Sequence, residues 1–371
     1  MIKTYLYRLY PTKAQTTLLE NILEECRWIY NKTLEIRKDA WEVSKESFNY
    51  YTTSKYLIQW KKERPTLKIV HSQTLQDVQI RVDLAFNAFF RRAKTGENPG
   101  YPRFKGFMRY DSFSFPQSGF ILDGNKLKIS KIGWLKIHIH RNIVGSIKKL
   151  TIKRHSTDKW YASFYVEYEN AVLPKSDKVV GIDMGLQTFA TLSDETKIEN
   201  PKFFKREEKA LAKAQRKLSK AEKGTSERAK RRKVVSRIHE RITNRRSNFI
   251  HQESRKIINK FGLIAVEKLN INNMNSFIAV NKSIRDAAWS SFIAALSYKA
   301  EEAGRTFVSI NPAYTSQLCS RCHSLVPKTL EDRIHSCPIC GLQIDRDLNA
   351  AYNILALGIH SVGRIPRSPD L

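Results

Sequence analysis

The sequence predicts a multidomain α+β fold: an N-terminal β-barrel with an inserted helical domain, then an α/β domain interrupted by a small cysteine module. Three observations predict this fold class. Runs with period-two alternation occur in residues 1–11 and, from Phe113 to Glu169, in residues 97–174, whereas apolar residues recur at helical spacing within residues 12–96. The C-terminal half contains short, continuously apolar strands and a final amphipathic helix. A length of 371 residues favours two or three domains over one core.

The N-terminal half begins with a strand pattern at Ile2–Tyr10, which Pro11 ends. Thr12 and Gln15 then have the spacing of a capping box, so a helix is expected to start there. Because the first strand alternates like the β-rich residues 97–174, we expect it to join their sheet, which makes residues 12–96 a helical insertion. Small antiparallel barrels of this OB-like size often hold nucleic acid.

The C-terminal half reads as an α/β domain formed by residues 175–314 and 344–371. Residues 202–256 are expected to be a basic helical insertion in it, and residues 315–343 form the cysteine module. The remaining patterns predict strands and helices in alternation. The expected strands are Val179–Asp183, Gln187–Leu192, Leu263–Glu267 and Thr306–Ile310, and the expected helices are Trp289–Ala303 and one from Leu348.

The charge of the chain is strongly positive. There are 65 Lys and Arg against 36 Asp and Glu, which gives a net charge of +29. Such a charge is typical of a protein whose partner is a polyanion, and it favours a nucleic-acid binder over a merely solubilised surface. Residues 202–256 alone contain 20 basic and 6 acidic residues, a net +14. A solvated helix pair is the alternative, but clustering favours backbone contacts from Lys230, Arg231, Arg232, Lys233, Arg245 and Arg246.

Four of the five cysteines form two Cys-x-x-Cys pairs, Cys319/Cys322 and Cys337/Cys340, separated by 14 residues. This spacing predicts one structural Zn²⁺ held by four thiolates, and a redox role is less consistent with two adjacent copies. Cys26 fits a buried helix position instead. The absence of a disulfide pattern and of a long apolar segment predicts a cytoplasmic protein without a membrane partner.

Three acidic residues are candidates for a catalytic metal site. Asp183 and Glu267 each end an apolar strand, and Asp347 opens the last helix. Buried carboxylates are costly unless their charge is matched, so the three could converge on two Mg²⁺ ions, or Mn²⁺, for phosphodiester hydrolysis. Asp183 would bridge both ions. Asp345 competes with Asp347, but its position is that of an N-cap, so we expect it behind the ligands.

Several segments resemble the transposon-encoded TnpB (OrfB) proteins, relatives of the compact type V CRISPR nucleases. The segments are Gly181–Ser193, Val266–Asn270, Thr315–Cys322, Cys337–Gly341 and Asp345–Leu355. Tyr101–Gly106, followed by Tyr110–Phe113, resembles the middle region of that family. There are two departures: His323 replaces a usual glycine, and Lys268 lies where an acidic residue is common.

The resemblance implies an RNA-guided DNA endonuclease of a mobile element. A guide RNA from the transposon end would pair with double-stranded target DNA beside a short adjacent motif, read by a wedge barrel and a helical recognition domain. A RuvC-like domain of the RNase H fold, interrupted by a zinc ribbon, would cut with Asp183, Glu267 and Asp347. The protein would act as a monomer.

Three other functions stay open at this point. A nuclease-inactive RNA-guided DNA-binding repressor would lose acidic residues that this sequence retains. An accessory transposition protein is another alternative, and so is a DNA-strand transposase, because His138-Ile139-His140 superficially fits a single-strand transposase motif. Strand alternation explains those histidines without it.

Overall fold

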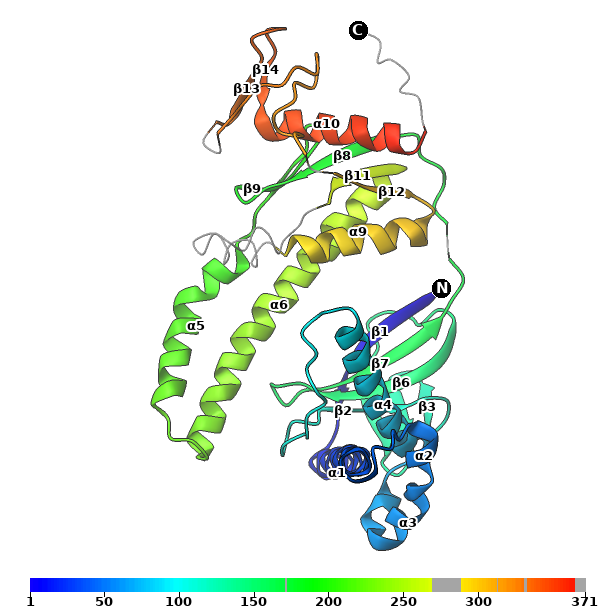
Figure 1. The fold of residues 1–371 in the computed structure, drawn as a ribbon. Helices are drawn as coiled ribbons and strands as arrows, with labels where there is room; N and C mark the ends of the chain where they lie inside the picture. Colours follow the sequence, from blue (N-terminus) through cyan, green and yellow to red (C-terminus); the bar gives the residue numbers. More distant parts are fainter. Residues whose placement is uncertain (171, 269–287, 312, 330–331, 364–371) are drawn as a thin grey trace. The chain divides into compact units, whose positions relative to one another are not determined.

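The computed structural model describes residues 1–170, 172–268, 288–311, 313–329 and 332–363 (Figure 1). Two compact units, Met1–Glu169 and Asn170–Leu371, make up the chain. The predicted nuclease domain includes residues 269–287 and 364–371, and these lie outside the described residues, as does the end of the Val266–Asn270 segment. No helix of the described residues is both long enough and apolar enough to cross a membrane.

The first unit contains a seven-stranded antiparallel sheet in the order β2-β6-β7-β1-β5-β4-β3. Its strands are β1 Ile2–Tyr10, β2 Ser112–Phe115, β3 Phe120–Asp123, β4 Lys126–Ile129, β5 Gly133–His138, β6 Ser146–Arg154 and β7 Trp160–Glu167. The N-terminal strand β1 lies at the centre of the sheet, where Leu6 is opposite Ser163 of β7 and Leu9 is opposite Ile137 of β5. The prediction that this strand joins the later sheet is therefore confirmed.

The predicted barrel is nearly, but not fully, closed. β2 and β3 end the strand order and are not paired with each other in the described sheet. The rings of Phe115 and Phe120 contact across this gap, with centroids 6.4 Å apart. Each edge strand is four residues long. Closure at this seam therefore depends on packed aromatic rings, because such short strands offer few groups for a hydrogen-bonded ladder.

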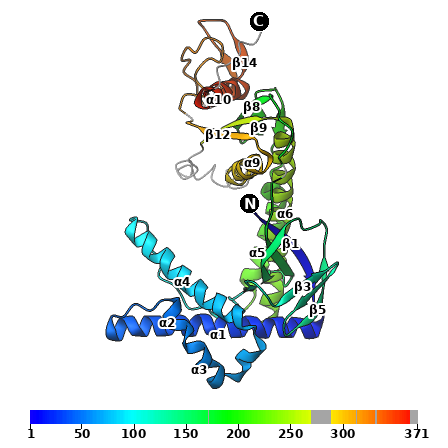
Figure 2. The same cartoon turned by 90° about the vertical axis from the view of Figure 1, so that its right-hand side faces the viewer.

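The helices between β1 and β2 pack on this sheet and share its core. They are α1 Lys13–Ser44, α2 Tyr50–Ser54, α3 Tyr56–Glu63, η1 Pro65–Ile69 (a 3₁₀ helix) and α4 Ser72–Lys94. Figure 2 shows α1 as one long helix beside the shorter ones. The predicted capping box is present, because Thr12 Oγ1 accepts from the backbone N–H of Gln15 and Gln15 Oε1 accepts from the N–H of Thr12. Leu19, Val78 and Phe164 are all fully buried in the shared core.

The second unit contains a mixed five-stranded sheet in the order β10-β9-β8-β11-β12. Its strands are β8 Val179–Met184, β9 Thr188–Leu192, β10 Lys197–Glu199, β11 Leu263–Glu267 and β12 Thr306–Ile310. β11 is parallel to both β8 and β12, whereas β9 is antiparallel to β8 and β10. The four predicted strands are confirmed. β10 was not expected, because three residues are too few for an alternation pattern.

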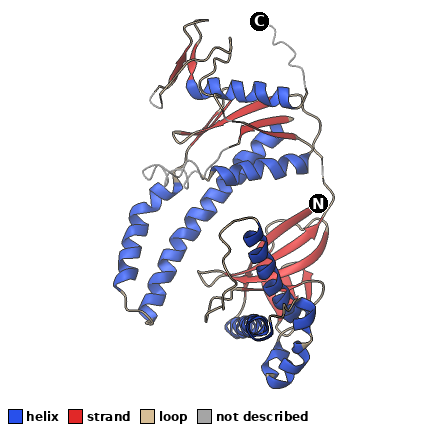
Figure 3. Ribbon diagram, in the orientation of Figure 1, coloured by secondary structure: helices blue, strands red, loops and turns tan. Residues whose placement is uncertain are grey.

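Helices cover both faces of this sheet, so the unit has three layers (Figure 3). α6 Ser226–Lys260 and α9 Trp289–Ala303 pack on the face that contains Val180 and Val266. α10 Arg346–Ser361 packs on the other face, with Ile354 buried against Ala265. Period-two alternation thus assigns successive residues of β8 and β11 to opposite layers.

The basic residues 202–256 form a helical hairpin of α5 Phe203–Lys220 and α6, side by side in Figure 1. Its small core consists of Leu211, Ala214, Ile238 and Ile242. The cysteine module adds the hairpin of β13 Ile334–Ser336 and β14 Gln343–Asp345 directly before α10.

Candidate functional site

Asp183 and Glu267 lie at the same edge of the second sheet. The register of the parallel strands β8 and β11 places Ile182 opposite Val266, so the next residue on each strand is a carboxylate. Both carboxylates alternate with residues of the layer that faces α9, and they therefore belong to the face covered by α10. The two strand ends thus bring together acidic residues that are 84 positions apart in the sequence.

The third carboxylate, Asp347, reaches this edge because α10 lies unusually close to the sheet. An added Cβ on Gly181 would come within 2.1 Å of the carbonyl oxygen of Ala351, and one on Gly358 would come within 2.4 Å of the Cβ of Ala265. Glycine at both crossing points lets the helix backbone rest on the strands. The first turn of α10 then lies beside Gly185, whose added Cβ would be 3.9 Å from Asp347 Oδ2.

Asp183, Glu267 and Asp347 line one cavity of about 710 Å³. The same cavity is also lined by basic side chains that are not among the candidates from the sequence: Lys202, Lys205, Lys328, Arg333 and Arg346. The guanidinium of Arg346 donates from Nε and Nη2 to Asp347 Oδ1, at 3.1 and 3.0 Å. A basic rim around acidic groups suits a ligand that is itself anionic and brings cations with it.

The carboxylates of the cavity are electrostatically coupled. Burial raises the pKa of Asp183 well above its usual range, and the nearby charges of Glu267 and Asp347 raise it further, while Arg346 lowers it. Burial also raises the pKa of Glu267, and the hydroxyl of Thr315, which donates to Glu267 Oε1, lowers it. Burial and the neighbouring carboxylates thus disfavour the ionised form of Asp183.

Asp345 has a different role from the three cavity residues. Its Oδ1 accepts from the backbone N–H groups of Asp347 and Leu348, at 2.9 and 3.2 Å, and therefore caps α10. Its Oδ2 accepts from Lys197 Nζ at 2.7 Å. Helix α10 begins at Arg346, two residues before the expected start, because this cap fixes its first turn. Asp345 thus orients the turn that carries Asp347.

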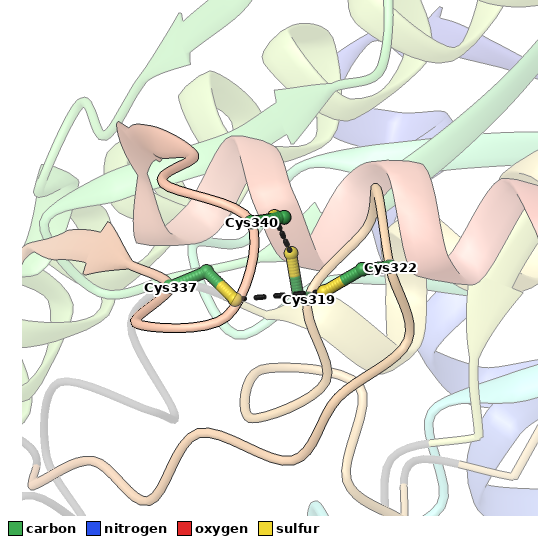
Figure 4. A group of neighbouring side chains, drawn as sticks. All are labelled: Cys319, Cys322, Cys337 and Cys340. Carbon is green, nitrogen blue, oxygen red and sulfur yellow. Dashed lines mark hydrogen bonds between the residues drawn. The ribbon is translucent and has the colours of Figure 1, made fainter.

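The four cysteine sulfurs gather in one place, within 4.8 Å of one another (Figure 4). Cys319 and Cys340 Sγ are 3.6 Å apart, and Cys322 and Cys337 Sγ are 3.5 Å apart. Four thiolates around Zn²⁺ at about 2.3 Å would be roughly 3.8 Å from one another, so this donor set fits a tetrahedral zinc site.

The two knuckles of the module have matching turns. The N–H of His323 donates to the carbonyl of Cys319, and the N–H of Gly341 donates to the carbonyl of Cys337. Both residues have a positive φ, +59° and +73°. His323 is thus a turn residue that adopts the conformation a glycine would adopt more easily.

The first knuckle is attached to α10 by two buried asparagines. Asn349 Nδ2 donates to the carbonyl of Leu318, and its Oδ1 accepts from the N–H of Ser320. Asn353 Nδ2 donates to the carbonyls of Thr315 and Leu318, at 2.8 and 2.7 Å. The same few residues therefore connect the cysteine site to Thr315, the partner of Glu267. The sequence offered no signal for these contacts beyond two asparagines four residues apart.

Two of the basic residues selected on α6 form ion pairs. Arg245 forms an ion pair with Glu207 at 3.1 Å, and Arg231 pairs with Glu227 at 2.6 Å. Lys230 and Arg232 are exposed. Their contact with nucleic acid stays a prediction.

The fold is of the kind found in compact CRISPR-associated endonucleases. The chain superposes on the Cas12f1 chain of a cryo-EM complex with single-guide RNA and target DNA, with a TM-score of 0.57, at 16% identity, over 92% of this chain and 83% of the other. It also matches the mini RNA-guided endonuclease Cas_phi3, with a TM-score of 0.53 at 8% identity, over 100% of this chain and 94% of the other.

The chain belongs to the TnpB (OrfB) family of IS605-type elements. The OrfB_IS605 model, described as a probable transposase, matches residues 163–277, the OrfB helix-turn-helix model matches residues 1–46, and the Cas12f1-like TNB model matches residues 289–354. A "Putative RNA-guided DNA endonuclease" of Streptomyces pristinaespiralis is 34% identical, over 96% of this chain and 89% of that protein. InsQ of Escherichia coli (strain K12), which bears the same description, is 30% identical over 97% of this chain and 93% of that protein.

Proposed function

We propose that this protein is an RNA-guided DNA endonuclease of a mobile element, cutting target DNA beside a short adjacent motif. The carrying observation is that Asp183, Glu267 and Asp347 line one basic-rimmed cavity in a chain whose relatives are described as RNA-guided DNA endonucleases. The strong positive charge supports the binding of RNA and DNA backbones together.

The cutting domain in this proposal is a RuvC-like domain with the RNase H fold. Residues 175–314 and 344–371 would form it, and residues 315–343 would be its inserted zinc ribbon. The mixed strand order, with the antiparallel β9 beside the parallel β8 and β11, supports this assignment. Residues 1–11 and 97–174 would form the wedge domain, and residues 12–96 the recognition domain. The near-closed sheet and its shared core support that pairing.

Asp183, Glu267 and Asp347 would hold the catalytic Mg²⁺ ions, or Mn²⁺. The three carboxylates line one cavity, where burial first and their mutual repulsion second raise the pKa of Asp183, and hard cations suit such a group of oxygen ligands. When bound, such ions supply an activated water and stabilise the leaving oxygen of a phosphodiester.

The protein's own groups would orient this site. Thr315 keeps Glu267 in one position through its hydrogen bond, and the cap at Asp345 fixes the first turn of α10. Lys202, Lys205 and Arg333 line the cavity and would attract the phosphates of the scissile strand. Arg346 neutralises Asp347 and would turn to phosphate as substrate enters.

The structural Zn²⁺ would be held by Cys319, Cys322, Cys337 and Cys340. It would supply no open coordination position, because four thiolates complete a tetrahedral shell. Its function would be to keep the knuckle that carries Thr315 against α10.

The test begins with expression of the chain together with its flanking genomic DNA and sequencing of the RNA that co-purifies. One discrete RNA that ends in element-adjacent sequence is expected. The complex should then cut a plasmid that carries the matching target, in the presence of Mg²⁺, and the Asp183→Ala complex should retain the RNA but cut at least about 1,000-fold more slowly.

The outcomes separate the alternatives. Target binding without cleavage by the wild-type complex would indicate the nuclease-inactive repressor. A covalent protein–DNA intermediate would indicate a transposition enzyme. Random cellular RNA, or none, would contradict guided recognition. The expected monomer is measured on the same complex by light scattering.

A further inference from the structure

The segment of residues 101–109 runs along α1 and is fixed to it. Asn31 forms two hydrogen bonds with the backbone of Lys105. Its Nδ2 donates to the carbonyl at 3.0 Å, and its Oδ1 accepts from the N–H at 2.7 Å. Arg27 Nη1 donates to the same carbonyl at 3.0 Å. Further along, Arg154 Nη2 donates to the carbonyl of Met108 at 3.4 Å. The backbone of this segment is thus held by side chains rather than by a strand ladder.

The fixed segment presents aromatic rings outward. Pro102 and Tyr110 are buried at its two ends, whereas Phe104 and Phe107 are 52% and 74% exposed. A turn in which the N–H of Arg109 donates to the carbonyl of Gly106 lies at Phe107. Burial would have been expected for two phenylalanines if they served the core. Their exposure on a fixed backbone points to a ligand instead.

The exposed rings continue at the start of the segment. Tyr101 packs edge-on against Phe86 and Phe89 of α4, with ring centroids 5.6 and 5.4 Å apart. Beside it, Trp41 of α1 and Phe90 of α4 are 54% and 53% exposed and line an apolar pocket of about 250 Å³. We define the aromatic track as Trp41, Phe90, Tyr101, Phe104 and Phe107.

The segment that carries Tyr101, Phe104 and Phe107 is basic, although Glu46 lines the pocket at Trp41 and Glu20 and Glu24 line the cavity at Phe107. Residues 101–109 contain Arg103, Lys105 and Arg109 and no acidic residue. Arg103 and Arg109 are exposed. Aromatic rings interleaved with cations suit a strand whose bases stack while its phosphates meet the basic groups. A duplex would not fit, because its bases are already stacked on each other.

We propose that the aromatic track binds unpaired nucleotides of the protein's RNA by stacking their bases. This inference rests on the proposed function and names one contact surface for that RNA. RNA is the favoured occupant because proteins recognise RNA chiefly at loops, bulges and ends whose bases are splayed onto aromatic and Arg side chains. A platform fixed in advance by Asn31 and Arg27 also suits a ligand that stays bound throughout the reaction.

The test compares Phe104→Ala/Phe107→Ala with Phe104→Tyr/Phe107→Tyr in the full chain. Both rings are exposed, so folding should be retained, and the Tyr variant keeps the stacking surfaces. Fluorescein-labelled oligo(U) of about 12 nucleotides, within the span of one single-strand site, is titrated into protein freed of RNA. The Ala variant should bind at least about tenfold more weakly, whereas the Tyr variant should stay within about twofold of the wild type.

The dependence on salt distinguishes stacking from charge. The slope of log K against log salt should be the same for the Ala variant and the wild type, because no phosphate contact is removed. Arg103→Ala/Arg109→Ala should lower that slope instead. Trp134→Ala, another exposed ring of the first unit outside the track, should leave oligo(U) affinity unchanged.

The RNA that co-purifies with the protein decides whether the track binds RNA or single-stranded DNA. The Ala variant should retain at least about tenfold less of it after a high-salt wash. Unchanged RNA retention together with weakened oligo(dT) binding would assign the track to DNA and overturn the proposal. Equal oligo(U) affinities for all three proteins would overturn it too, as would a dimer of the wild type that the Ala variant abolishes.

If the wild-type protein retains no discrete RNA, the proposed function fails. The oligo(U) comparison would still decide whether the track binds single strands, so the two failures are distinguishable.

Discussion

At the scale of single residues, the cavity carboxylates are placed at an energetic cost. Asp183 is buried beside two further carboxylates, and its pKa is raised for that reason. The pKa of an aspartic acid in the unfolded chain is about 3.9. When the folded state raises this pKa, the protein loses stability as the pH rises from the unfolded value to the folded value. Because neutral pH lies above the unfolded value, Asp183 lowers the stability of the fold there.

Asp183→Asn should accordingly raise the melting temperature above that of the wild type at pH 7 in buffer without Mg²⁺. Adding Mg²⁺ should stabilise the wild type by about 2.7 kcal/mol at a concentration one hundred times its Kd, but should stabilise the variant much less. Thermal unfolding followed by circular dichroism measures both effects. Equal responses of the two proteins to Mg²⁺ would contradict cation binding at Asp183.

Thr315 offers a second test at this scale, because its hydroxyl lowers the pKa of Glu267 against the effect of burial. Thr315→Val removes that donor, so the pKa of Glu267 should rise and the ionised form should be lost at a higher pH. When the cleavage rate is measured against pH, the fall in rate on the acidic side should therefore begin at a higher pH in the variant. Thr315→Ser keeps a hydroxyl and should retain the wild-type profile. A uniform loss of rate at every pH would instead indicate structural damage.

At the scale of elements, the site depends on how closely α10 approaches the sheet. Gly181 and Gly358 create that closeness, since neither position leaves space for a Cβ. The asparagines of α10 then attach the first cysteine knuckle to the same helix. One helix thus positions Asp347 and, through the knuckle, Thr315.

Gly181→Ala should displace α10, because its new methyl group would meet backbone rather than a flexible side chain. We expect a loss of about 1–3 kcal/mol in stability, which is typical of overpacking, and a larger loss of cleavage because Asp347 moves with the helix. Gly100→Ala is the matched control, since an added Cβ there contacts nothing within 4 Å. Denaturant unfolding and plasmid cleavage provide the two measurements. A fully active Gly181→Ala protein would show that the close approach does not position the site.

At the scale of the whole molecule, the two compact units have separate cores. The core of the first unit joins its sheet to α1 and α4, and those of the second lie on both faces of its sheet. The cysteine module belongs to the second unit. Among its described residues, only Thr315, Cys319, His335 and Cys337 are buried, and its four sulfurs lie close together in pairs 3.6 and 3.5 Å apart. Without a metal, such a small module has little apolar core of its own to hold it.

Zinc removal should therefore affect the second unit selectively. Cys337→Ser should reduce the bound zinc from one ion per chain, abolish cleavage and lower the unfolding temperature of the second unit, while leaving the unfolding of the first unchanged. Metal analysis and calorimetry provide the measurements, and Cys26→Ser, a buried cysteine of the first unit, is the contrasting variant. Full zinc content in the Cys337 variant would contradict the four-cysteine site.

Local patterns in the sequence determined most of the elements. Alternation located β1, short apolar runs located β8, β11 and β12, and the Thr12 capping box located the start of α1, because these signals arise between residues close in the chain. The spacing of the cysteines determined their grouping for the same reason. The resemblance to the TnpB family added the family that the comparisons confirm.

The tertiary structure alone decided what depends on residues far apart in the chain. It left the first sheet open between β2 and β3, and it surrounded the three carboxylates with basic side chains from five separate positions. It also determined the hydrogen bond from Thr315 to Glu267 and the one from Asn353 to the carbonyl of Thr315. Packing of α10 on the sheet brings these groups together, and no periodicity in the sequence encodes a contact between distant residues.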